Sequence, residues 1–86
     1  MVRIYKYKVE PSGNTFEDKF KKILKVDWQG DDLCIWALID DNSEMKTLNV
    51  YIIPTGVPFD LKLDLEYLDT IKDDLFIWHI FYELKE

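Results

Sequence analysis

The sequence is poor in the residues that build covalent or metal-held frameworks. Its 86 residues include one cysteine, Cys34, and one histidine, His79. A single cysteine excludes an internal disulfide and suits a reducing compartment. One cysteine and one histidine make no zinc-ligand spacing, and they exclude a catalytic triad that needs a second histidine. We therefore expect no metal, no cofactor and no catalytic residue.

Long apolar runs and clustered basic residues are also missing. The longest apolar run, LCIWALI, has seven residues, whereas a membrane helix needs roughly 20. The opening MVRIYKYKVE carries charge throughout, so we expect no signal peptide. Eleven basic residues are outnumbered by seventeen acidic ones, for a net charge of −6. Nucleic acids and anionic membranes both attract clustered positive charge, so we expect neither as a direct partner.

An acidic balance still permits a basic partner, although many small proteins are acidic for solubility alone. What the sequence does contain is enough apolar material for one core. Hydrophobic residues make up 48% and aromatic residues 15% of the chain. A chain of this length has little to spare beyond a single core. We therefore expect a single domain over residues 1–86.

Alternation of apolar and polar residues predicts β-strands along most of the chain. The expected strands are 2–9, 15–20, 23–29, 33–40, 46–53, 64–72 and 75–84. Clusters of Gly, Asn, Asp and Ser separate them, and PTGVPFDLKL at 54–63 is the longest expected loop. Residues 15–20 also fit helical spacing, but the preceding Gly-Asn turn favours a strand. The predicted fold is all-β, a small antiparallel sandwich or partly open barrel of about seven short strands.

One phrase occurs twice, as DDLCIWALID at 31–40 and as DDLFIWHIFY at 73–82. Each copy predicts a hairpin turn followed by the buried centre of a strand. Both faces of these strands are apolar, so each face should be covered, by the core on one side and by a loop, a short helix or a second subunit on the other. The repeat reflects either pseudo-symmetry of two hairpins or the few letters that Trp-centred strands use. The doubly apolar strands also suggest a homo-oligomer.

Exposed aromatic residues are the main candidates for binding, because so many rings cannot all be buried in a small domain. The PTGVP loop adds a hydroxyl and a flexible backbone, although such a segment is more often a rigid turn. His79, among apolar neighbours, is more often a packed residue with one hydrogen bond than a general base. Paired aspartates at turns are more often turn formers than cation ligands. The candidate binding residues are Trp28, Trp36, Tyr51, Thr55, Gly56, Trp78 and His79.

Several phrases together resemble a family of small bacteriophage and prophage proteins that is described only as a domain of unknown function. They are YKY at 5–7, KILKVDWQGDDLCIWALID at 22–40, YIIPTGVP at 51–58, EYLDTI at 66–71 and FIWHIF at 76–81. The family's loop often reads Gly-Thr-Gly-His-Pro, whereas this chain has Pro54 and Val57 in place of the first glycine and the histidine. The resemblance carries no activity and no site residue.

The resemblance implies a setting, the cytoplasm of an infected bacterium. Small phage accessory proteins commonly act by binding, so we expect a non-enzymatic protein that binds a host or defence macromolecule through aromatic side chains and an acidic rim. One alternative is a sponge for a small nucleotide signal, which would need Arg3, Lys6, Lys8 or Lys46 to gather around phosphate. Another alternative is a minor virion component.

Overall fold

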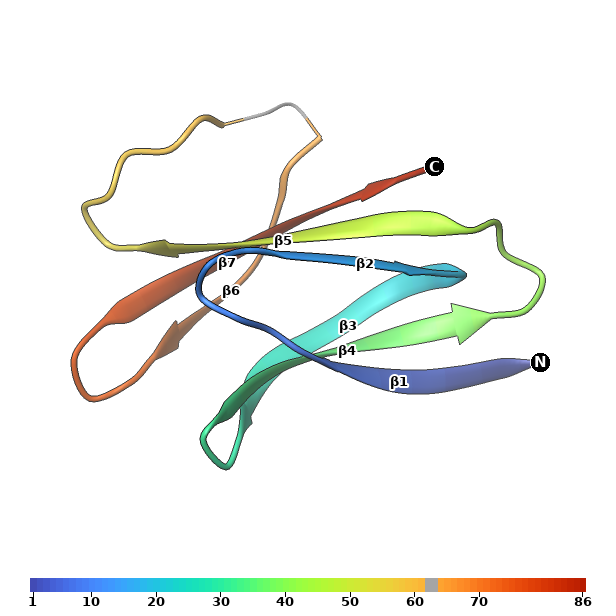
Figure 1. Ribbon diagram of the computed structural model, residues 1–86, viewed down its shortest axis with the longest axis horizontal. Coiled ribbons are helices and arrows are strands. Elements are labelled where there is room, and N and C mark those ends of the chain that lie inside the picture. Colours follow the sequence, from blue (N-terminus) through green and yellow to red (C-terminus); the bar gives the residue numbers. More distant parts are fainter. Residues whose placement is uncertain (62–63) are drawn as a thin grey trace.

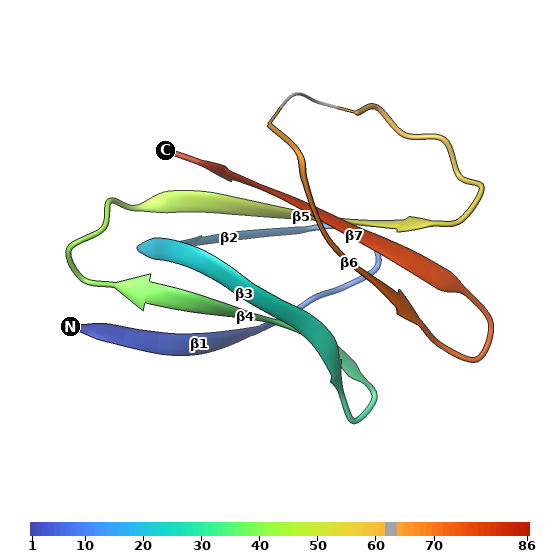
Figure 2. The same ribbon diagram turned by 180° about the vertical axis from the view of Figure 1, so that it is seen from behind.

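A computed structural model of the chain, which describes residues 1–61 and 64–86, is a sandwich of two antiparallel β-sheets (Figures 1 and 2). The strands are β1 (Val2–Lys8), β2 (Asn14–Asp18), β3 (Phe20–Gln29), β4 (Asp32–Asp40), β5 (Lys46–Pro54), β6 (Glu66–Lys72) and β7 (Ile77–Lys85). The first sheet has the order β1-β4-β3 and the second has the order β2-β5-β7-β6. The predicted all-β fold of seven strands is confirmed, and it takes the form of a sandwich. Lys62 and Leu63, the last two residues of the predicted loop, lie outside the described residues.

The core lies between the sheets and follows from the alternation of side chains along each strand. The first sheet contributes Ile35, Ala37 and Ile39 of β4, and the second contributes Leu48 and Val50 of β5 and Ile80 of β7, all buried. Each of these residues is followed by one that points to the outer face of its sheet. Each sheet therefore has one apolar face to bury, and the two sheets bury these faces against each other.

Two strand ends differ from the predicted ones, the start of β7 and the end of β5. The last strand begins at Ile77 rather than at residue 75, because the Asp73 carboxylate accepts the N–H groups of Leu75 and Phe76 at 2.8 and 2.7 Å. β5 continues to Pro54 opposite Trp78, one residue further than expected. The proline is tolerated there because the next ladder bond to β7 comes from Thr55, whose N–H donates to the Ile77 oxygen at 3.1 Å, so no donor is required of Pro54.

The two DDLxIW copies occupy equivalent places in the two sheets. β4 lies between β1 and β3, and β7 lies between β5 and β6, so each copy is the second strand of a hairpin and a central strand. The copies nevertheless face opposite ways. Ile35 is buried in the core and Trp36 points outward, whereas Ile77 is exposed and Trp78 packs against the core. The predicted buried strand centre is confirmed for the first phrase at Ile35 and wrong for the second at Ile77.

The outer faces of the two central strands are covered in different ways. Trp36 is half-buried between Lys6 of β1 and Lys25 of β3, whose aliphatic stems are long enough to lie along an indole. No helix lies over this face in the described part of the chain, and cover by a second subunit stays a prediction. Over β7, Phe59 of the β5–β6 connection approaches Phe81 with ring centroids 5.4 Å apart, as expected for a covering loop.

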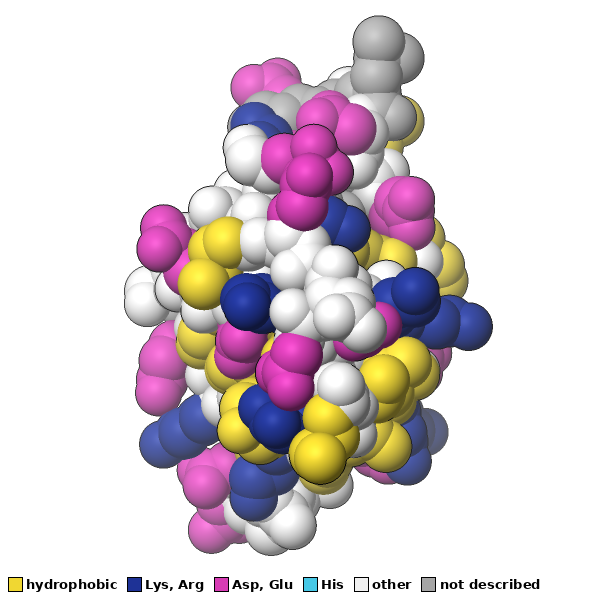
Figure 3. Space-filling model, turned by 90° about the vertical axis from the view of Figure 1, so that its right-hand side faces the viewer, with side chains coloured by type: hydrophobic (Ala, Val, Ile, Leu, Met, Phe, Trp, Pro, Cys, Tyr) yellow, Lys and Arg dark blue, Asp and Glu magenta, His cyan; other side chains and the backbone are white. Residues whose placement is uncertain are grey.

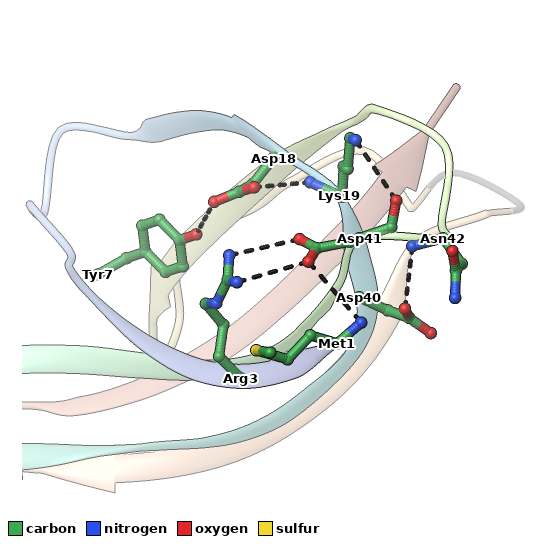
Figure 4. A network of polar contacts seen from close by, with 8 residues as sticks. All are labelled: Met1, Arg3, Tyr7, Asp18, Lys19, Asp40, Asp41 and Asn42. Carbon is green, nitrogen blue, oxygen red and sulfur yellow. Dashed lines mark hydrogen bonds and ion pairs between the residues drawn. The ribbon is translucent and has the colours of Figure 1, made fainter.

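The end of the sandwich that carries the N-terminus and the β4–β5 connection holds charges of both signs. Figure 3 shows acidic and basic side chains intermixed over this end, with small apolar areas between them. Figure 4 shows the polar network beneath, in which both terminal nitrogens of Arg3 bond Asp41 at 3.3 and 3.4 Å. In the same network, the Tyr7 hydroxyl donates to Asp18 at 2.6 Å. The opposite end of the molecule has a different character.

Candidate functional site

The opposite end contains a cleft where three connections meet. These are the β1–β2 connection, the β3–β4 turn and the β6–β7 turn, which lie together on the left-hand side of Figure 1. The cleft, called the end cleft below, has a volume of about 290 Å³. Its lining comprises Lys8, Val9, Glu10, Pro11, Trp28, Asp31, Asp32, Leu33, Ile52, Asp73 and Trp78. Two of the predicted binding residues, Trp28 and Trp78, are therefore brought together here.

The base of the end cleft is apolar and its indoles are fixed by hydrogen bonds. Val9 and Leu33 are buried in the core beneath it. The Trp28 indole N–H donates to the backbone oxygen of Lys72 at 3.1 Å, and the Trp78 indole N–H donates to Asp73 at 3.0 Å. Both polar edges of the indoles are thus used within the protein, so what the rings offer a ligand is their π surface.

The rim of the end cleft is acidic. Four lining residues are carboxylates and one, Lys8, is cationic. The Lys8 ammonium lies 3.4 Å from Asp32 and 3.7 Å from Glu10, and the Asp32 carboxylate, followed by Glu10, raises the pKa of Lys8. The Trp78 indole bond, followed by the backbone amides of the turn, lowers the pKa of Asp73 below its usual range. Both shifts favour the charged forms, so Asp73 stays ionised and Lys8 stays protonated at neutral pH.

An apolar tip, formed by Leu75, Phe76 and Ile77, adjoins the end cleft. These side chains are 84%, 51% and 47% exposed. The Phe76 ring stacks at a tilt on Trp78 with centroids 5.2 Å apart, so the tip is continuous with the aromatic lining. A small domain rarely leaves consecutive large apolar residues in water unless something covers them.

A chain of hydroxyl groups on the outer face of the second sheet holds His79. Thr55 lies 2.7 Å from one ring nitrogen, Nε2, and Thr70 lies 3.2 Å from the other, Nδ1. Tyr67 continues the chain with its hydroxyl 2.5 Å from that of Thr70. The prediction joined neither Thr70 nor Tyr67 to the histidine. The signal that could have found Thr70 is the register of the β6–β7 hairpin, in which it pairs with His79.

The remaining predicted residues lie elsewhere. Gly56 has a φ of 88° at the turn that follows Thr55, a conformation that favours glycine. The Tyr51 hydroxyl donates to Glu83 at 2.8 Å, and this bond is the main cause of a raised Tyr51 pKa. Trp36 stays on the outer face of the first sheet, apart from the end cleft. The seven predicted residues thus do not form one site.

The lining of the end cleft indicates which ligands it could hold. Among residues 1–61 and 64–86, no cluster of three or more His, Cys, Asp or Glu side chains is placed to hold a metal ion. The described part of the chain also contains no helix long and apolar enough to cross a membrane. An aromatic cavity with fixed indoles and a carboxylate rim favours cationic or mixed apolar and cationic ligands.

Comparisons with known proteins place the chain in a family. No curated protein and no solved structure matches it. A family model described as "Domain of unknown function (DUF7352)" matches residues 1–86. Because that match spans the whole chain, the protein belongs to the DUF7352 family.

Proposed function

We propose that the protein is a phage-encoded accessory protein that binds a host or defence protein in the cytoplasm of an infected bacterium and does not catalyse a reaction. The resemblance of its Trp-centred and TG-x-P phrases to small phage proteins supports the setting. One structural observation carries the binding role: the exposed apolar tip is continuous with the acid-rimmed end cleft.

The tip supplies affinity in this proposal. Covering apolar surface contributes about 25 cal/mol for each Å² removed from water, and Leu75 alone is 84% exposed. Aromatic side chains that are already fixed lose little freedom on binding, and they commonly dominate interface energies. Phe76 is held against Trp78 in this way.

The rim supplies selection. Glu10, Asp31, Asp32 and Asp73 surround the same opening with a single lysine among them. Such a field accelerates the approach of a basic partner and repels an acidic one. The partner that fits is therefore a protein segment with both apolar and basic side chains.

A sponge for a nucleotide signal fits the same surface less well. Its phosphates would need cations at the aromatic site, but Arg3 is bonded to Asp41 at the far end of the sandwich. Lys8, the cation that does line the cleft, is already held by Asp32 and Glu10. A phosphate approaching the indoles would meet carboxylates first.

A pull-down from lysate of infected cells tests the proposal. We expect tagged protein to retain one stoichiometric host or defence protein, and Leu75→Ser to reduce that retention about tenfold or more because an interface anchor is lost. Leu61→Ser, which changes another leucine that is 74% exposed, is the matched control and should retain the partner fully. Neither substitution removes a core contact.

Two outcomes overturn this function. A nucleobase released on heating, with no protein retained, would replace the binding protein with the sponge. A retained protein that is lost equally from both leucine variants, or from neither, would remove the tip as the binding surface.

A further inference from the structure

We propose that the end cleft binds the guanidinium group of an arginine side chain from the partner protein. This inference rests on the proposed function and names the chemistry that its site recognises. Three features of the cleft carry it: its size, its two indoles and the cation that already occupies its rim.

The volume of the end cleft is enough for one long side chain. It holds about 290 Å³, at the lower limit of the roughly 300–1,000 Å³ typical of small-molecule and cofactor sites. A side chain that lies along the floor of the cleft, rather than pointing straight into it, would rest its methylene stem near Val9 and Leu33 and bring its charged head to the indoles and the carboxylates.

The indoles favour a planar cation. Trp28 and Trp78 both line the cleft with their N–H groups bonded to Lys72 and Asp73, so each ring is held in place before a ligand arrives. A cation near an indole face is attracted by the ring quadrupole. Guanidinium stacks on aromatic rings and sheds water more easily than ammonium, and its fork of donors matches a carboxylate.

Lys8 shows that the rim attracts positive charge. Its ammonium bridges Asp32, the first residue of β4, and Glu10 of the β1–β2 connection, at 3.4 and 3.7 Å. We infer that Lys8 occupies part of the negative field that a partner's arginine would use. The rim retains unequal charge even so, with four carboxylates to one lysine.

An NMR titration with isotope-labelled protein tests this proposal directly. The probe is Nα-acetyl-arginine amide, and its neutral isostere Nα-acetyl-citrulline amide is the ligand control. We expect the arginine probe to move the indole N–H peaks of Trp28 and Trp78 in a saturable way, while the peak of Trp36, outside the cleft, stays in place. Citrulline should bind at least about fivefold more weakly, because it lacks the charge.

The Lys8→Gln variant provides the second test. Removing the internal cation should increase the affinity for the arginine probe by about threefold to tenfold, the Coulomb effect of one charge at short range. Lys22→Gln, the same substitution on β3 outside the cleft lining, is the matched control and should change affinity less than twofold. Because Lys8 is exposed, its replacement should leave the fold intact.

The outcomes separate this inference from the proposed function. Equal binding of arginine and citrulline, equal shifts at all three indoles, or no gain from Lys8→Gln would overturn the arginine site. If the pull-down still depended on Leu75, the binding function would stand without it. If the probe bound as expected but no protein were retained from lysate, the function would fail and the cation site would stand.

Discussion

At the scale of single residues, tyrosines bonded to carboxylates connect the packing to the response to pH. Tyr82 donates to Glu66 at 2.8 Å, and burial, followed by this bond, raises the pKa of Tyr82 to about 12. Burial and the bond to Asp18 also raise the pKa of Tyr7. An unfolded tyrosine loses its proton near pH 10. The fold therefore favours the neutral phenol of both residues.

The raised pKa values of these tyrosines make the folded protein less stable at high pH. A group whose pKa is higher in the folded state contributes stability that is fully present below its unfolded pKa and is lost as the pH rises through its folded pKa. For Tyr82 the window runs from about pH 10 to about 12. We expect Tyr82→Phe to reduce the slope of unfolding free energy against pH in this window without abolishing it, since Tyr7 remains. Urea unfolding at several pH values measures the slope, and an unchanged slope would contradict the assignment.

The site residues show what the sequence could reveal and what it could not. An excess of aromatic rings marked Trp28 and Trp78 as candidates, and the structure places both in the end cleft. Their separation from Trp36 depends on which face of a strand each residue occupies, and a strand apolar on both faces gives no signal for that choice. Asp73 was read only as a turn former, and it is one, but it also orients Trp78. The second role depends on a contact five residues along the chain.

At the scale of strands, the repeated phrase illustrates how an odd offset changes the outcome. The period of a strand is two, so a shift by an odd number of residues exchanges its faces. β4 begins at Asp32, the second residue of its phrase, whereas Asp73 holds the second phrase in a turn until Ile77, the fifth residue of its phrase, which is an offset of three. Trp78 consequently faces the end cleft while Trp36 faces outward. Strand positions were predictable from alternation, but this exchange required the turn geometry.

The hydroxyl chain around His79 links three consecutive parts of the second sheet. Thr55 follows β5, His79 lies in β7 and Thr70 lies in β6, so the imidazole ties the start of the long connection to the hairpin. A hydrogen bond of this kind contributes about 0.5–1.5 kcal/mol net. The contribution of Thr55 belongs at the lower part of that range, because its side chain is exposed to water.

A double-mutant cycle measures this link. We expect Thr55→Val and His79→Phe to destabilise the fold separately, and the double variant to lose less than their sum by about 0.5–1 kcal/mol. Urea unfolding of the four proteins gives the coupling energy. Strictly additive losses would show that the 2.7 Å contact between Thr55 and His79 does not stabilise the sheet.

At the scale of the whole molecule, the two ends of the sandwich arrange their charges differently. The N-terminal end pairs its charges, as Arg3 does with Asp41 (Figure 4). The opposite end concentrates carboxylates around Trp28 and Trp78. The net charge of −6 in the sequence indicated an acidic protein but could not place four carboxylates around one cleft. That placement follows from strand order, which brings the β3–β4 and β6–β7 turns together.

A homo-oligomer stays a prediction, and the outer face of the first sheet is where we propose that a second copy would bind. Ile4 is 60% exposed there and lies directly opposite Leu38, next to the pair of Lys6 and Trp36. β1 is also the edge strand of this sheet, and its basic side chains disfavour edge-to-edge pairing. A second copy would therefore cover the face rather than extend the sheet.

Light scattering over a range of concentrations decides the oligomeric state. We expect wild-type protein to have a mass above the 10.3 kDa of one chain. We expect Ile4→Lys to lower the mass to that of one chain, because a charge placed in an apolar interface is costly to desolvate. Met45→Lys, at another exposed apolar residue, is the matched control and should leave the assembly intact. Wild-type protein that remains a single chain at every concentration would show that the lysine stems beside Trp36 already suffice to cover this face. The doubly apolar β4 strand would then reflect a sheet that completes its own cover, and the end cleft with its tip would be the one binding surface proposed for the molecule.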